Sequence, residues 1–168
     1  MQSFIKQANA FSSARKPFFF LIDFEQKQPV LLPLAECSSH QIFFQFPTCN
    51  NVSFSDFDKQ FEFSRRPLKF DRYQTAFELV KNEIQKGNSY LLNLAFPTQI
   101  QTNYSLKDIF IKIQAKYKLL YQDKFVCFSP ETFIHIKDNK IYSYPMKGTI
   151  NESEENAKQK LLDSKKEF

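Results

Sequence analysis

The amino-acid sequence predicts an α+β fold, with mostly antiparallel strands and helices packed outside them. Three observations carry this prediction. Runs of aromatic and β-branched residues, separated by turn residues, occur near the N-terminus and again after residue 125. Between them, residues 71–86 repeat apolar side chains at helical spacing. The 168 residues include only two glycines but 21 phenylalanines, a composition that favours strands and packed helices over flexible linkers.

The first third of the chain predicts three strands. Residues 17–24 form an apolar run that indicates a buried strand, and residues 30–34 and 41–46 are two further candidates. We expect the three to follow one another as a β meander. Residues 47–69 alternate Phe with polar residues and are interrupted by Pro47 and Pro67, so they predict an irregular connector with room for a short strand or helical turn.

Residues 71–86 give the clearest helical pattern. Asp71 is predicted to cap the start of the helix and Gly87 to end it. The apolar residues recur at steps of four, three and four and form one stripe: Tyr73, Phe77, Val80 and Ile84. We expect this stripe to pack on a sheet.

The segments that follow the helix alternate between strand and helix patterns. Residues 89–98 predict a strand, and Ser105 is a predicted N-cap for a second helix. Leu106, Ile109, Phe110 and Ile113 form that helix's apolar stripe. Near the end of the chain Ser153 is a predicted cap for a last helix. Acidic residues at the start of that helix (Glu152, Glu154, Glu155) and lysines at its end (Lys165, Lys166) complement the helix dipole.

A hairpin is predicted from about Phe125 to Met146, with its turn at Asp138-Asn139. Counting outward from that turn places Glu131 opposite Lys147 or one residue away from it. Paired strands lie about 4.8 Å apart, so the two side chains can meet if they share a face. A carboxyl and an amine held together on rigid strands can exchange protons or activate a nucleophile.

These segments also carry a family resemblance. Ser129-Pro130-Glu131, followed by Pro145-Met146-Lys147-Gly148-Thr149, resembles the chorismate-binding family, which includes anthranilate synthase component I and the isochorismate and salicylate synthases. Residues 87–94 resemble the Gly-Asp-x-Tyr-Gln-Val-Asn-Leu signature of the aminodeoxychorismate synthase component I branch, with Asn88 for Asp and Leu91 for Gln. The resemblance covers roughly residues 70–168.

The resemblance implies a role for each matched residue. Chorismate is a dianionic cyclohexadiene whose C4 hydroxyl is a poor leaving group. Lys147 is implied as the nucleophile that adds at C2, and Glu131 as the general acid and base. Gly148 and Thr149 are implied to contact the substrate. Anthranilate and isochorismate synthases usually carry Ala where Lys147 stands, so the lysine favours the aminodeoxychorismate branch, which serves p-aminobenzoate and folate synthesis.

The resemblance also implies components that this sequence does not supply. The family's catalytic domain continues beyond the element resembled by Lys166-Glu167, and its carboxylate ligands for Mg²⁺ lie further on. The implied partners are chorismate and a glutamine amidotransferase subunit that supplies ammonia. Two alternatives stay open beside the amination of chorismate: a non-catalytic truncated remnant, and an anthranilate- or isochorismate-synthase type of chorismate enzyme.

The implied fold is a partial, anthranilate-synthase-like αββα sandwich that lacks its C-terminal half. We divide the chain into an N-terminal β-rich part, residues 1–66, and the first part of the chorismate-binding domain, residues 67–168. Half of a sandwich leaves a sheet edge and an apolar face unprotected, so the chain by itself is expected to aggregate or to be poorly ordered, and to be inactive.

Composition argues against several other classes of protein. The net charge of +5 is dispersed, with no basic cluster longer than Arg65-Arg66, which speaks against nucleic-acid binding. Three cysteines without a Cys-x-x-Cys spacing speak against a disulfide framework or a zinc site and favour a reducing cytoplasm. The apolar runs are too short to cross a membrane, and the N-terminus lacks a signal-peptide core.

Overall fold

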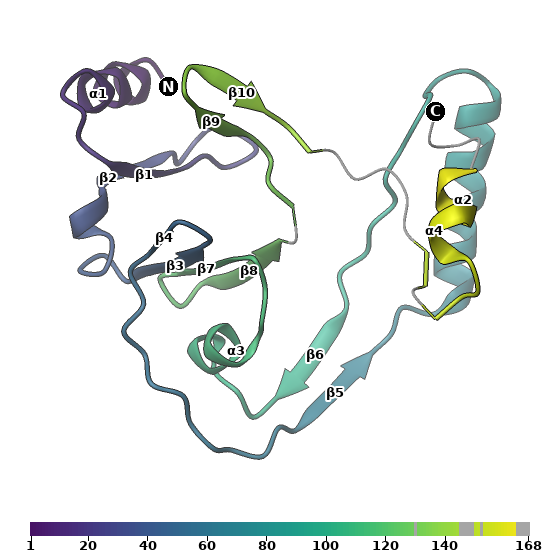
Figure 1. Cartoon of the computed structure of the whole chain (residues 1–168). Coiled ribbons are helices and arrows are strands. Elements are labelled where there is room, and N and C mark those ends of the chain that lie inside the picture. The colour runs from purple at the N-terminus through teal and green to yellow at the C-terminus, as the bar shows by residue number, and fades with distance from the viewer. Residues whose placement is uncertain (130, 145–149, 152, 164–168) are drawn as a thin grey trace.

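Figure 1 shows a computed structural model of the chain, which describes every residue except 130, 145–149, 152 and 164–168. The predicted α+β class is confirmed, because helices accompany sheets whose described pairs are all antiparallel. The elements in chain order are α1 (Gln2–Ser13), β1 (Phe18–Leu21), β2 (Val30–Pro33), η1 (Leu34–Glu36), β3 (Ile42–Phe46), β4 (Cys49–Asn50), β5 (Phe63–Arg66), α2 (Phe70–Gln85), β6 (Gln99–Thr102), α3 (Leu106–Lys112), β7 (Tyr117–Tyr121), β8 (Phe125–Ser129), β9 (His135–Lys137), β10 (Lys140–Tyr142) and α4 (Ala157–Leu162).

The N-terminal strands form where the aromatic run predicts them. β1 pairs with β2 from Phe18 opposite Pro33 to Leu21 opposite Val30. Helix α1 was not predicted, although aromatic residues on it contact β1: the Phe11 and Phe18 rings lie 5.8 Å apart, and the Phe4 ring meets an edge of Phe20. The seven-residue spacing of Phe4 and Phe11 is the sequence signal that indicates this helix.

The predicted meander is wrong at its third strand. β3 does not continue the β1–β2 pair but lies in a four-stranded sheet of order β4-β3-β7-β8. Ile42 of β3 stands opposite Tyr121 of β7. β7 contributes buried Leu119 to the core that Phe19, Cys37, Ile42 and Phe44 form beside it. β3 pairs with β7, which is distant in sequence, and not with β2, which precedes it along the chain. Local sequence patterns do not identify such a distant partner.

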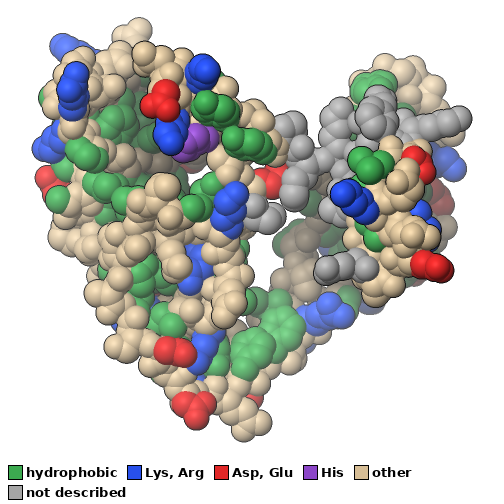
Figure 2. Space-filling view, in the orientation of Figure 1, with side chains coloured by type: hydrophobic (Ala, Val, Ile, Leu, Met, Phe, Trp, Pro, Cys, Tyr) green, Lys and Arg blue, Asp and Glu red, His purple; other side chains and the backbone are tan. Residues whose placement is uncertain are grey.

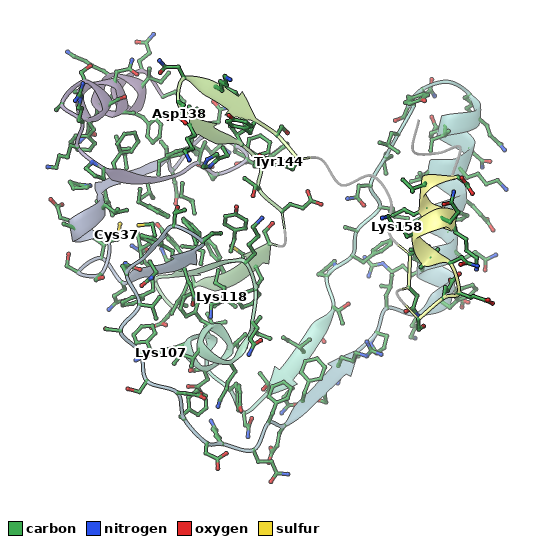
Figure 3. All side chains as sticks on the ribbon, in the orientation of Figure 1. Cys37, Lys107, Lys118, Asp138, Tyr144 and Lys158 are labelled. Atoms are coloured by element: carbon green, nitrogen blue, oxygen red, sulfur yellow. The ribbon has the colours of Figure 1, made fainter. Side chains whose placement is uncertain are left out.

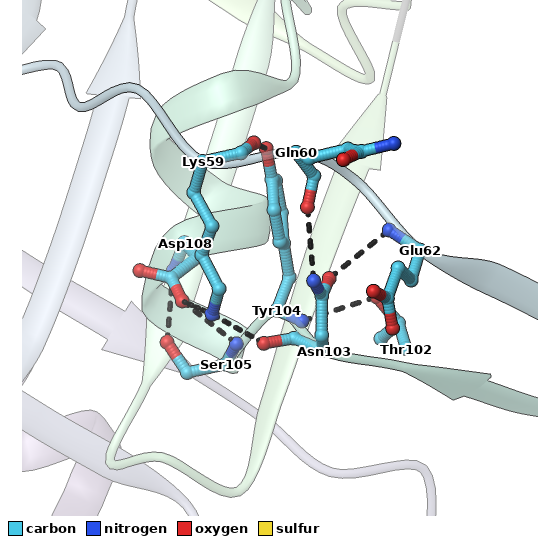
Figure 4. A network of polar contacts seen from close by, with 8 residues as sticks. All are labelled: Lys59, Gln60, Glu62, Thr102, Asn103, Tyr104, Ser105 and Asp108. Atoms are coloured by element: carbon cyan, nitrogen blue, oxygen red, sulfur yellow. Dashed lines mark hydrogen bonds and ion pairs between the residues drawn. The ribbon is translucent and has the colours of Figure 1, made fainter.

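The connector before β5 is irregular, as predicted, and polar contacts hold its second half (Figure 4). The Asn103 side chain donates to the carbonyl of Gln60 at 2.9 Å and accepts from the backbone N–H of Glu62 at 3.1 Å. The Tyr104 hydroxyl donates to the carbonyl of Lys59 at 2.6 Å. These bonds attach the connector to the chain between β6 and α3.

Helix α3 begins with the cap that the sequence predicts. The Ser105 hydroxyl accepts from the backbone N–H of Asp108 at 3.1 Å, and the Asp108 carboxylate accepts from the backbone N–H of Ser105 at 2.9 Å. This reciprocal pair satisfies two donors that would otherwise lack partners. Phe110 is fully buried, so the helix lies against the four-stranded sheet.

Helix α2 confirms one predicted cap and corrects the other. Gly87 has φ +79° and its N–H bonds to the carbonyl of Ile84, while the N–H of Asn88 bonds to the carbonyl of Glu83. This is the Schellman arrangement that favours glycine. Asp71 is not the N-cap, because the helix begins one residue earlier, after Lys69, and Asp71 lies in its first turn. A carboxylate there still favours the helix dipole.

Two further predictions are wrong. Residues 89–98 form no strand, since no described residue pairs with them; Tyr90 is 97% and Leu91 84% exposed. A strand exists only with a hydrogen-bonded neighbour, whatever its propensity. Ser153 does not cap the last helix, because the N-cap of α4 is Asn156. The φ of Asn156 is 56°, in the left-handed region, so the helical conformation does not extend back to Ser153. Glu152, Lys165 and Lys166 lie outside the described residues.

The expected packing of α2 on a sheet is also absent from the described structure. None of its residues is buried. Figure 1 shows α2 on the side of the molecule opposite the four-stranded sheet, joined to the remainder by the extended segments around β5 and β6. The division of the chain at residues 66 and 67 stays a prediction.

Candidate functional site

The turn of the predicted hairpin is confirmed. β9 pairs with β10 so that Lys137 stands opposite Lys140 and His135 opposite Tyr142. Asp138 and Asn139 both have positive φ, 51° and 57°. Positive φ at both central residues defines the type I′ turn, whose twist matches that of antiparallel strands. Asp138 marks this turn in Figure 3.

The hairpin is shorter than predicted. Residues 132–134 lie outside β9, and the described pairing ends at His135 and Tyr142. β8 instead pairs with β7, with Ser129 opposite Tyr117. β8 and the β9–β10 hairpin therefore belong to two separate ladders, because β7 offers β8 a buried partner strand that the sequence pattern did not reveal.

Glu131 lies just beyond the end of β8. The Ser129 hydroxyl accepts from the backbone N–H of Glu131 and lies in donor position to its carbonyl, both at 3.2 Å. This local turn fixes the Glu131 backbone at the strand end. Its exposed carboxylate borders a cavity of about 740 Å³. That volume is in the range of small-molecule sites, about 300–1,000 Å³.

Other residues of this cavity were not predicted. Lys116 and Tyr117 reach it from the start of β7, and Phe46 from the end of β3. The Tyr117 hydroxyl makes a short hydrogen bond to the Thr132 hydroxyl, and the Lys116 ammonium donates to the same oxygen at 3.4 Å. These contacts attach the segment after Glu131 to β7. No local motif indicates Lys116, because only the β7–β8 pairing brings it near Glu131.

The cavity combines aromatic walls with two opposite charges. The Phe46 and Tyr117 rings lie 5.8 Å apart, and Tyr142 stacks on Tyr144 at 6.5 Å. Tyr144 itself borders the cavity. Among the ion pairs of the described residues, none involves the Lys116 ammonium or the Glu131 carboxylate. Such a site can hold a small ring against the aromatic side chains and present it with one cation and one proton-transfer group.

The remaining predicted site residues, Lys147, Gly148 and Thr149, lie outside the described residues, so their placement beside Glu131 stays a prediction. Within the described part of the chain, no group of three or more His, Cys, Asp or Glu side chains could hold a metal ion. Among the same residues, no helix is long and apolar enough to span a membrane.

Comparison with known proteins gives two kinds of match. A sequence model of the family described as chorismate binding enzyme matches residues 10–168. A protein of Pasteurella multocida (strain Pm70) that carries the name uncharacterized PabA-like protein is 50% identical over 169 residues, which are 99% of this chain and 52% of the relative. A protein of the same name from Haemophilus influenzae is 49% identical over 167 residues, 99% of this chain and 51% of the relative. The chain thus spans about half the length of these curated relatives. No solved structure matches it.

Proposed function

Because this chain belongs to the chorismate-binding enzyme family, we propose that it forms part of an aminodeoxychorismate synthase component I. The reaction is the amination of chorismate to 4-amino-4-deoxychorismate, on the route to p-aminobenzoate and folate in the cytoplasm. The observation that carries the proposal is the cavity at the end of β8, which the exposed Glu131 and Lys116 side chains both border. The placement of Lys147 beside Glu131 is part of the proposal.

The proposed chemistry divides one difficult substitution into two substitutions joined by a covalent intermediate. The Lys147 amine adds at C2 of chorismate, the ring double bonds shift, and the C4 hydroxyl leaves as water after Glu131 protonates it. Ammonia then adds at C4, the electrons return through the ring, and the lysine is expelled. A lysine amine is ordinarily protonated at neutral pH, so a proton must first pass from Lys147 to Glu131 or another base.

The cavity at Glu131 fits this substrate class. Chorismate carries two carboxylates and one unsaturated ring. Lys116 supplies a positive charge without an acidic partner among the described residues, and Tyr117 and Tyr144 supply aromatic surface. Gly148 and Thr149 are proposed as further substrate contacts. The described residues offer no cluster for the Mg²⁺ that the family implies, so no step of the proposal runs through the metal.

The ammonia is proposed to come from a glutamine amidotransferase subunit. In an assay, ammonium chloride at alkaline pH replaces that subunit and removes it as a variable. The chain is supplied together with the segment of the P. multocida relative that it does not align with, since it spans about half of that relative. The product is followed by its separation from chorismate on a reversed-phase column.

Two substitutions test the roles. Lys147→Ala is expected to abolish formation of 4-amino-4-deoxychorismate, because the adduct at C2 cannot form, while Lys137→Ala, on β9, leaves the rate within about twofold. Glu131→Gln is expected to slow the reaction by about 10²–10⁴-fold, the usual contribution of a general acid. Normal turnover by the Lys147→Ala protein would show that the nucleophile is assigned wrongly.

A non-catalytic remnant is the second candidate, and the exposure of large apolar side chains such as Leu91, Phe133 and Ile141 favours it. Titration of the chain with chorismate, followed by calorimetry, separates the two candidates. Binding that is lost on Lys116→Met supports the enzyme site. If neither the chain nor its assembled form binds chorismate, the enzyme proposal is refuted and the remnant stands.

A further inference from the structure

The outer face of the four-stranded sheet carries a buried cation. Lys118 of β7 is 7% exposed, and Figure 3 labels it between the sheet and α3. Its side chain lies on the face opposite to the core residue Leu119, because neighbouring residues of a strand point to opposite faces. An ammonium removed from water is unfavourable unless other groups compensate its charge. The groups around Lys118 therefore indicate what this position can bind.

The chain compensates this charge only in part. The Lys118 ammonium donates to the carbonyls of Phe110 and Ile113 at 3.0 and 3.1 Å. An ammonium has three N–H donors, so the third has no oxygen acceptor among the described residues. The Phe110 ring, with its centroid 4.9 Å from the ammonium, attracts the cation but carries no net charge. None of the ion pairs of the described residues includes Lys118.

Lys118 borders a cavity of about 330 Å³, a volume within the range of small-molecule sites. Gln45 stands opposite Lys118 in the β3–β7 ladder, so the two side chains are neighbours on the same face of the sheet. Gln114 reaches the cavity from the segment that follows α3. The cavity thus combines an ammonium with two amide groups, and all three can donate hydrogen bonds to an anion.

The walls of this cavity are partly aromatic. Phe54 from the connector and Phe110 from α3 both line it, and their rings meet edge to face at 6.3 Å. Asp56 and Lys112 border it as well and form an ion pair with each other at 2.7 Å. Since Lys112 holds the Asp56 carboxylate, the charge of Lys118 stays without an anionic partner in the described structure.

The attraction of this cavity for an anion is local. Figure 2 shows lysine and arginine side chains dispersed over the visible face, with acidic side chains among them. Dispersed surface charge is screened by salt and does not direct an anion to one place. The cavity itself has two lysines, Lys112 and Lys118, against one acid, Asp56. A buried ammonium interacts more strongly with an anion than an exposed one does, because less water lies around it.

We propose that this cavity binds a small aromatic monocarboxylate. The carboxylate accepts hydrogen bonds from the third N–H of Lys118 and from the amides of Gln45 and Gln114, and the ring lies against Phe54 and Phe110. One carboxylate matches the one uncompensated charge, and an aromatic ring matches the aromatic walls. The proposal does not depend on the amination of chorismate, because none of these residues borders the cavity at the end of β8.

Calorimetric titration of the 168-residue chain with sodium benzoate measures the binding. Benzyl alcohol is the uncharged comparison with the same ring, and sodium acetate is the carboxylate without a ring. Benzoate is expected to bind at least about tenfold more tightly than either, because each lacks one of the two features. Sodium phosphate tests for a general anion site, and binding of phosphate as tight as that of benzoate refutes the aromatic part of the proposal.

Matched substitutions locate the ligand. Lys118→Met is expected to weaken benzoate binding at least about tenfold, because the buried charge is lost. Lys124→Met removes the same charge from an exposed position in the β7–β8 turn and is expected to change the affinity less than about twofold. Lys118→Met also removes two hydrogen bonds within the chain, so Gln45→Leu, at an exposed position, is the variant that keeps the ammonium. It is expected to weaken binding about threefold. Far-UV circular dichroism checks that each variant folds.

Three results overturn the proposal. One is the absence of detectable binding to the wild type at millimolar benzoate. Another is an affinity that neither Lys118→Met nor Gln45→Leu changes. The third is binding that is lost on Lys116→Met and kept on Lys118→Met, because benzoate then occupies the cavity of Glu131.

Discussion

Lys118 is the one buried charged side chain among the residues that the structure describes, and replacing it tests how α3 is held on the sheet. The side chain is 7% exposed, and its ammonium donates to the carbonyls of Phe110 and Ile113 at 3.0 and 3.1 Å. Both carbonyls lie at the C-terminal end of α3, where the last carbonyls of a helix lack partners within it. The ammonium therefore closes the helix end and attaches it to β7.

Lys118→Met keeps the length of the side chain and removes the donor. Two hydrogen bonds from a charged donor contribute about 1.5–3 kcal/mol each, and the penalty for burying the ammonium offsets part of that gain. We expect a net loss of about 2 kcal/mol in the free energy of unfolding. The measurement is urea denaturation followed by circular dichroism at pH 7, with Lys124→Met, an exposed lysine in the β7–β8 turn, as the control.

The pH dependence gives a second, independent reading. Burial lowers the pKa of the Lys118 ammonium below its usual value of 10.5. The unfolded chain then binds more protons than the folded chain between the lowered pKa and 10.5, so wild-type stability rises with pH through that window. The Lys118→Met protein lacks this rise. A variant as stable as the wild type, with an unchanged pH profile, would refute the reasoning.

Four further predictions concern the helix caps and the cavity of Glu131. Ser105→Ala is expected to lower the free energy of unfolding by about 1 kcal/mol, because the N–H of Asp108 loses its acceptor. The hydrogen bond from the Ser105 N–H lowers the pKa of the Asp108 carboxyl below its usual value of 3.8. The contribution of this carboxylate to the free energy of unfolding is therefore fully present above pH 3.8 and is lost as the pH falls through the lowered pKa. Acid titration of the wild type, followed by circular dichroism, measures this loss. Gly87→Ala is expected to destabilise α2 by about 1 kcal/mol, because a residue with a Cβ is strained at φ +79° even where the added Cβ would meet no neighbouring atom within 4 Å. Thermal unfolding measures the loss, and an unchanged melting temperature would contradict it. Lys116→Met is expected to weaken chorismate binding at least about tenfold in calorimetry with no change in stability, and equal affinity would remove Lys116 from the site.

The predictions that succeeded depend on local chemistry. The Asp138-Asn139 turn, the Ser105 cap and the Gly87 helix end are each determined by a few residues whose backbone preferences and hydrogen bonds act within one turn. The short motif around Glu131 carries the family resemblance, and the family model matches residues 10–168. The role of Glu131 as the acid stays a prediction.

The predictions that failed depend on partners distant in sequence. Residues 89–98 have the composition of a strand but no described neighbour to pair with, and β3 pairs with β7 and not with β2. Lys116 borders the cavity of Glu131 only because β7 and β8 are paired. Propensity states what a segment can form, whereas pairing is decided by which apolar surfaces bury one another.

The sequence by itself determined the family, the Asp138-Asn139 turn, the Ser105 cap and the Gly87 helix end, since these follow from short motifs and from side-chain chemistry acting over a few residues. Only the tertiary structure decided which strands are neighbours, which residues share the cavity with Glu131, and which apolar faces stay uncovered. The physical reason is that burial is a property of two surfaces in contact, and no single segment of a chain specifies the surface it will meet.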